Sequence, residues 1–178
     1  MIYLNVKTIS KHKYIKYINV FKQYGLKGEI FMAKIDYIED LTEWRSGFKY
    51  SIPIYIRFSE TDMIGHMNNV SPFIYFEEAR IKFLQSLGLF SNGVYKEGVP
   101  VVADLQCNYL KQSFFGETLD MYVKANHVGN SSVDFHYMAI NEKEEITLTG
   151  RGRLVFIDKD SGKPVPLKDD IKRILQNA

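Results

Sequence analysis

The sequence contains a single cysteine, Cys107, so no disulfide can form within the chain. This excludes a small secreted domain held together by disulfides and fits a reducing cytoplasm. No apolar run approaches the roughly 20 residues that a membrane-spanning helix needs. The N-terminus also lacks the apolar stretch and small-residue cleavage site of a secretory signal. These absences predict a cytoplasmic protein with no integral membrane contact.

The 178-residue chain also has little net charge, +2 overall, but the charge is unevenly distributed. Residues 1–31 hold six lysines and one glutamate, giving +5 and leaving −3 for the rest. A mildly acidic body gives no support for nucleic-acid binding. The basic head could be a surface helix touching anionic lipid, a loosely attached extension, or a segment upstream of a true start at Met32. We favour the third hypothesis and predict one domain over residues 32–178.

Hydrophobic residues make up 46% of the chain, and their spacing predicts its elements. Apolar residues alternate from Ser51 to Phe58, as in a strand with one buried face. From about Val70 they follow helical spacing, and Gly88 is a natural stop, which predicts a helix of about five turns. Four more alternating runs predict strands, and glycine- or asparagine-containing turns separate them as hairpins. These runs and turns are residues 101–109, 119–125, 133–139 and 146–157, with Gly116, 129–130 and 141–143. A short helix near residues 167–175 completes an α+β architecture, a consecutive antiparallel meander against one helix.

The loop between the first strand and the long helix carries the chemistry-bearing residues. It reads TDMIGHMNN from Thr61 to Asn69, with a carboxylate, a glycine, an imidazole and two amides. A helix start presents unpaired N–H groups and a partial positive charge. A carboxylate beside it can attack a carbonyl that those groups polarise, or activate water against it. The loop therefore suits hydrolysis of an ester or thioester.

The segment RFSETDMIGHMNN from Arg57, with FEEAR at Phe76–Arg80, resembles the 4-hydroxybenzoyl-CoA thioesterase family of acyl-CoA thioesterases. Two later segments, GNSS from Gly129 and VFID…GKPVP from Val155, strengthen the resemblance, which covers residues 51–174. It implies a hotdog fold, an antiparallel sheet wrapped around one long central helix. It also implies hydrolysis of an acyl-CoA to a carboxylic acid and CoA without metal or cofactor. The active unit would be a homodimer, and a homotetramer is also compatible.

The resemblance assigns Asp62 as the catalytic carboxylate, acting as nucleophile or as base for water. A turn or N-cap aspartate is the structural alternative. His66 is a second catalytic candidate or a structural histidine, and N–H groups near Gly65 and His66 are candidate oxyanion donors. The predicted substrate contacts are Gly65, Met67, Asn68 and Asn69. For the two asparagines, however, a helix cap is the preferred interpretation.

Two positions depart from the family pattern. Ile64 stands where plant acyl-ACP thioesterases, which share the fold, carry a catalytic asparagine. Pro72 replaces a common aromatic residue, and a helix tolerates it in the first turn. Because of Ile64, the catalytic mechanism of the plant enzymes does not carry over directly to this chain. Because of Pro72, we expect a differently shaped pocket mouth.

Other residues offer weaker alternatives. Glu77 or Glu78 could replace Asp62 as nucleophile, but a solvated helix face with a Glu78–Lys82 pair is the preferred interpretation. Cys107 is predicted to lie in the core, and the histidines show no metal-ligand spacing. The rival functions are an acyl-ACP thioesterase and a non-catalytic acyl-thioester-binding protein. The spacing of Asp62 and His66, with no Asn-Pro between them, argues against a hydratase.

Overall fold

The computed structural model describes residues 35–91, 94–95 and 98–178. The chain divides into two compact units, Met1–Trp44 and Arg45–Ala178. The predicted basic head and the alternative start at Met32 lie outside the described residues. The predicted boundary at residues 31/32 stays a prediction.

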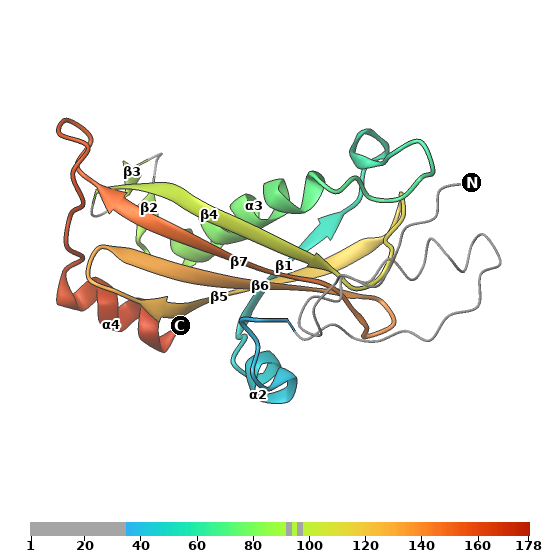
Figure 1. Cartoon of the computed structure of the whole chain (residues 1–178), viewed down its shortest axis with the longest axis horizontal. Helices are drawn as coiled ribbons and strands as arrows, with labels where there is room; N and C mark the ends of the chain where they lie inside the picture. Colours follow the sequence, from blue (N-terminus) through green and yellow to red (C-terminus); the bar gives the residue numbers. More distant parts are fainter. Residues whose placement is uncertain (1–34, 92–93, 96–97) are drawn as a thin grey trace, which may run out of the picture. The chain divides into compact units, whose positions relative to one another are not determined.

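A five-stranded antiparallel sheet dominates the second unit (Figure 1). The strands lie in the order β1-β5-β6-β7-β4. Their bounds are β1 (Tyr50–Tyr55), β4 (Val99–Tyr109), β5 (Thr118–Val128), β6 (Ser132–Asn141) and β7 (Ile146–Ile157). The predicted strands are therefore confirmed, and β5, β6 and β7 form the predicted hairpins.

One predicted connection is wrong. β4 pairs with β7 rather than with β5, so Gly116 does not close a hairpin. Residues 110–117 instead leave one edge of the sheet and reach the end of β1, where Gly116 donates its N–H to Ile56 O at 3.0 Å. The sequence pattern missed this because alternation identifies a strand without identifying its partner. Residues 110–117 therefore pass directly beside the loop of residues 61–69, where Met67 N donates to Ser113 O.

Helix α3 (Ser71–Ser86) packs on one face of the sheet, as predicted, and is slightly shorter than expected. Phe76, fully buried, stacks on Tyr137 of β6 with ring centroids 4.3 Å apart. The helix ends before Gly88, whose φ of +69° lies in the left-handed region that favours glycine. Burial of one helix face against the inner face of the sheet forms the core of the unit.

The alternation over residues 101–109 would give a strand with one buried face, and the first half of β4 departs from it. The pairing register shifts between Val102 and Asp104, and a bulge reverses which side chains face the helix. As a result, Val101 is 44% exposed and Ala103 is also exposed. Leu105, after the bulge, is half-buried. β4 is also an edge strand, so its first half leaves apolar side chains at the surface.

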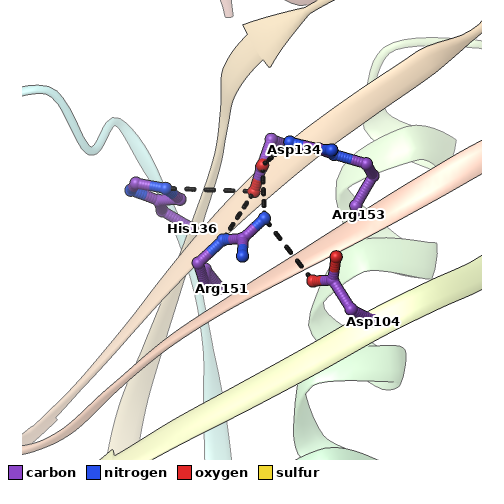
Figure 2. Close-up of polar contacts among 5 residues, drawn as sticks. All are labelled: Asp104, Asp134, His136, Arg151 and Arg153. Carbon is purple, nitrogen blue, oxygen red and sulfur yellow. Dashed lines mark hydrogen bonds and ion pairs between the residues drawn. The ribbon is translucent and has the colours of Figure 1, made fainter. Parts of the chain in front are cut away.

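β6 is buried on both faces, which the alternating pattern did not predict. On the face away from α3, Asp134 accepts hydrogen bonds from Arg151 at 2.6 Å and Arg153 at 3.2 Å (Figure 2). Arg151 also pairs with Asp104 at 3.4 Å. Burial raises the pKa of the Asp134 carboxyl, but the two guanidinium groups hold it below its usual range. Burial lowers the pKa of His136 to about 4 although Asp134 lies 4.0 Å away.

The remaining elements are short. They are α2 (Leu41–Ser46), η2 (Phe58–Glu60), β2 (Phe90–Ser91), β3 (Val94–Tyr95) and α4 (Asp169–Asn177). Helix α4 is the predicted final helix and buries Ile171 and Leu175. In the part of the chain that the structure describes, no helix has the length and apolar character to cross a membrane.

Candidate active site

The loop after β1 folds back on itself as a short hairpin. Asp62 donates its N–H to His66 O at 2.8 Å, and Asn68 donates its N–H to Glu60 O at 2.7 Å. The tip carries Gly65 at φ +83°, a conformation that glycine adopts without the strain of a side chain. Residues 60–68 are thus fixed by backbone pairing rather than left as an open loop.

The Asp62 carboxylate is anchored by the backbone of its own hairpin. Its Oδ1 accepts hydrogen bonds from Ile64 N at 2.8 Å and His66 N at 3.1 Å. Within the described residues, Oδ2 accepts no hydrogen bond, and the side chain is exposed. One oxygen therefore fixes the orientation of the carboxylate, and the other is free to react.

The two N–H groups predicted as oxyanion donors are engaged inside the hairpin. Gly65 donates to Asp62 O at 3.1 Å, and His66 donates to Asp62 Oδ1. The N–H of Asn69, in contrast, donates to no acceptor among the residues that the structure describes. Asn69 lies just before α3, where the helix dipole adds a partial positive charge. Asn69 is therefore a better candidate oxyanion donor than Gly65 or His66.

The predicted helix cap is wrong, because the N-cap residue of α3 is Val70 and has no side-chain cap bond; Asn68 instead forms a turn just before the helix. Its Oδ1 accepts a hydrogen bond from Val70 N at 3.0 Å, and its backbone O accepts one from Ser71 N at 3.0 Å. These bonds turn the chain into α3. Asn69 is tied to β4 because its backbone O accepts a hydrogen bond from the Tyr109 hydroxyl. The asparagines thus fix the junction between the hairpin and the helix.

The structure places His66 and Met67 in packing positions. The His66 ring lies edge-on to Phe114, with centroids 5.0 Å apart, and hydrogen-bonds no other described residue. Its link to Asp62 runs through the backbone only. The Met67 side chain packs against the hydrophobic core, and Met67 N donates to Ser113 O at 2.8 Å. Their predicted roles in catalysis and substrate binding stay predictions.

A buried carboxylate that sequence reasoning missed lies at the base of the hairpin. Glu60 is 8% exposed, and its Oε1 accepts a hydrogen bond from Arg57 Nε at 3.1 Å. Its Oε2 accepts from Arg57 N at 2.9 Å and from the Tyr75 hydroxyl at 2.8 Å. Hydrogen bonds from Arg57 lower the pKa of Glu60 to about 2 against the opposing effect of burial. The three-residue spacing of Arg57 and Glu60 was the only sequence signal for this pair.

The alternative nucleophiles fit other roles. Glu78 forms the predicted ion pair with Lys82, 2.7 Å between the charged groups. Burial raises the pKa of Cys107 to about 12, so the thiolate is scarce near neutral pH. In the described ranges, no three His, Cys, Asp or Glu side chains lie together as metal ligands.

Exposed apolar side chains surround the hairpin and the start of α3. Met63 and Ile64 lie at the hairpin tip, and Val70 and Ile74 lie at the start of the helix. Phe114, against His66, is 41% exposed. Such a concentration of exposed apolar side chains marks a binding surface more often than a solvated one.

A five-stranded antiparallel sheet covered by one long helix is the architecture that the family resemblance implies. The family model of the thioesterase-like superfamily matches residues 56–175. Uncharacterized protein YsmA of Bacillus subtilis (strain 168) is 45% identical over 133 residues, covering 75% of this chain and 89% of that protein.

Two solved structures, each 27% identical in sequence, share the fold. A DHNA-CoA thioesterase from Staphylococcus aureus has a TM-score of 0.65 and covers 71% of this chain and 88% of its own. A thioesterase from Thermus thermophilus, complexed with coenzyme A and Zn, has a TM-score of 0.63 and covers 74% and 95%. The chain belongs to the thioesterase-like superfamily and has the α+β hotdog fold.

Proposed function

We propose that this protein hydrolyses acyl-CoA thioesters in the cytoplasm, with Asp62 as the reacting carboxylate. The observation that carries the proposal is the anchoring of Asp62 Oδ1 by two backbone N–H groups, which leaves Oδ2 available. Family membership and the CoA in the Thermus thermophilus structure support the thioester class. The exposed apolar side chains around the hairpin suit an acyl group.

The chemistry needs no group beyond this chain and water. Asp62 either attacks the thioester carbonyl carbon, expelling the CoA thiolate and leaving a mixed anhydride that water hydrolyses, or removes a proton from an attacking water. Both routes place negative charge on the carbonyl oxygen. In this proposal the N–H of Asn69, next to the start of α3, stabilises that charge.

Thiol release from a panel of acyl-CoA substrates tests the proposal. Asp62→Asn keeps an oxygen that can accept the hydrogen bonds of Ile64 and His66, so the hairpin should persist while the charge is lost. We expect kcat to fall by a factor of about 10² to 10⁴ in Asp62→Asn and Asp62→Ala. Asp120→Asn, which removes an exposed carboxylate on β5, should keep the wild-type rate.

Two results would count against the proposal. Undiminished hydrolysis in both Asp62 variants would overturn the assignment of the site. If the wild-type protein hydrolysed no acyl-CoA, the hydrolase proposal would fail, and tight binding of acyl-CoA in the same experiment would favour a binding protein. Hydrolysis restricted to acyl-ACP would move the proposal to that carrier.

A further inference from the structure

We propose that Glu60 is a positioning residue that holds the Asp62 hairpin against the start of α3. This inference rests on the proposed function, because it assigns Glu60 to the same site. Glu60 does not touch the reacting atoms. It acts through Asp62 and Asn69, the two residues that contact the reacting atoms in the proposed reaction.

The contacts of Glu60 join three segments whose relative positions determine the geometry of the proposed site. Its carboxylate is bonded to Arg57, in the segment after β1, and to the Tyr75 hydroxyl in the second turn of α3. Its backbone O accepts hydrogen bonds from Asn68 N at 2.7 Å and from the Ser71 hydroxyl at 3.0 Å. One residue therefore links the strand exit, the second arm of the hairpin and the helix.

Both proposed reacting groups lie next to this junction in the chain. Asp62 is two residues after Glu60, and Asn69 directly follows Asn68, the residue paired with Glu60. A displacement of the hairpin relative to α3 would change the separation of the carboxylate and the oxyanion donor. Misplacement of catalytic groups by about 1 Å costs on the order of 10²-fold in rate.

The donors around Glu60 require a carboxylate rather than an amide. Arg57 presents its N–H and guanidinium, and Tyr75 presents its hydroxyl, so both Glu60 oxygens accept. Glutamine has one oxygen and one NH₂ group, so its NH₂ would face hydrogen-bond donors that now bind a Glu60 oxygen. Glu60→Gln therefore preserves size while breaking the junction.

Asp134 provides a matched control because it is equally buried and also paired with arginine. Glu60 and Asp134 are both 8% exposed. Asp134 lies on the face of the sheet away from α3 (Figure 2), and its arginine partners, Arg151 and Arg153, are both on β7. Asp134→Asn removes a buried charge without touching the hairpin.

The experiment compares Glu60→Gln, Tyr75→Phe and Asp134→Asn by steady-state kinetics and by hydrogen exchange of backbone amides, below the unfolding temperature of each. For Glu60→Gln we expect kcat to fall at least tenfold with less than a threefold change in KM. Exchange of the amides in residues 61–70 should rise at least tenfold. Tyr75→Phe should show the same changes to a smaller extent. Asp134→Asn should speed exchange in β6 and β7 and leave kcat within twofold.

Unchanged kcat and unchanged loop exchange in Glu60→Gln would overturn the proposal. An equal fall of kcat in Asp134→Asn would also overturn it, because the effect would then follow from lost stability. If Glu60→Gln fails to fold, Tyr75→Phe decides the question, since it keeps the Arg57–Glu60 pair. If the wild-type protein hydrolyses no thioester, the proposed function fails, and loop exchange still decides the role of Glu60.

Discussion

Among single residues, His136 has the clearest consequence for stability. Burial lowers its pKa from 6.5 to about 4, so the folded protein keeps this imidazole neutral where an unfolded chain would protonate it. The unfolded state therefore binds more protons between pH 6.5 and pH 4. The contribution of neutral His136 to the free energy of unfolding is fully present above pH 6.5 and is lost as the pH falls towards 4. The loss amounts to about 3 kcal/mol at most.

We predict that His136→Gln flattens this part of the pH dependence. The free energy of unfolding, from urea titrations at pH 7.5, 5.5 and 4.5, should fall less with decreasing pH in the variant than in the wild type. His127→Gln, at an exposed position of β5, should follow the wild-type profile. Parallel profiles for wild type and His136→Gln would contradict the prediction.

The candidate site could be predicted from sequence only in part, and Asp62 and Glu60 show why. Asp62 lies in a local sequence motif, and the spacing of that motif makes it a candidate. Glu60 depends on Tyr75, fifteen residues away, and on the hairpin pairing with Asn68, neither of which leaves a periodic signal. The free N–H of Asn69 depends on which backbone groups pair inside the loop, and a sequence does not show that pairing.

At the scale of the elements, β7 approaches α3 closely enough that only glycine fits at one position. A Cβ added at Gly150 would lie 2.4 Å from Cζ of Phe76. Phe76 is fully buried and stacked on Tyr137, so its ring has no room to withdraw. We predict that Gly150→Ala lowers the free energy of unfolding by about 1–3 kcal/mol, the usual cost of overpacking.

Gly152 on the same strand is the matched comparison for this prediction. Its added Cβ would also lie 2.4 Å from a side-chain atom, but that atom is the far end of the half-buried Leu105, which can rotate. Gly152→Ala should therefore cost less, about 1 kcal/mol or below. Urea unfolding of both variants measures their free energies of unfolding. A larger loss in Gly152→Ala than in Gly150→Ala would contradict the prediction that the contact with Phe76 is the more costly one.

The strands themselves were predictable because alternation is a local pattern, but their order was not. In β6, the alternating apolar residues from Val133 to Ala139 are fully buried, as the sequence predicts, although the residues between them are buried too. The pairing of β4 with β7 joins residues far apart in the sequence, such as Leu105 and Gly152, which are 47 positions apart, and no local pattern encodes it. The bulge at Ala103 was likewise not predictable from alternation, because one unpaired residue puts the side chains before it and after it on opposite faces.

For the whole molecule, the two edges of the sheet differ in a way that bears on assembly. β1 forms one edge with six residues, and both edge strands contain one proline, Pro53 in β1 and Pro100 in β4. β4 forms the other edge with eleven residues and exposes Val99, Val101 and Val102. The edge with the longer strand and more exposed valines is the one more prone to pair with another chain. We therefore expect two copies of this protein to associate through β4, in agreement with the homodimer or homotetramer that the family resemblance implies.

Val101→Lys tests this assembly because a lysine on an edge strand opposes pairing with a second strand. We predict that the wild-type protein sediments as a dimer or tetramer and that Val101→Lys shifts it towards the monomer. Thiol release should fall at least tenfold with dissociation, because the family resemblance implies that the active unit is a homodimer. Ser51→Lys, at an exposed position of β1, introduces the same charge on the opposite edge and should change neither property. A monomeric wild type, or a Val101→Lys variant that remains associated, would show that β4 is not the edge that joins the subunits. A monomeric variant with full activity would instead show that each subunit carries a complete site.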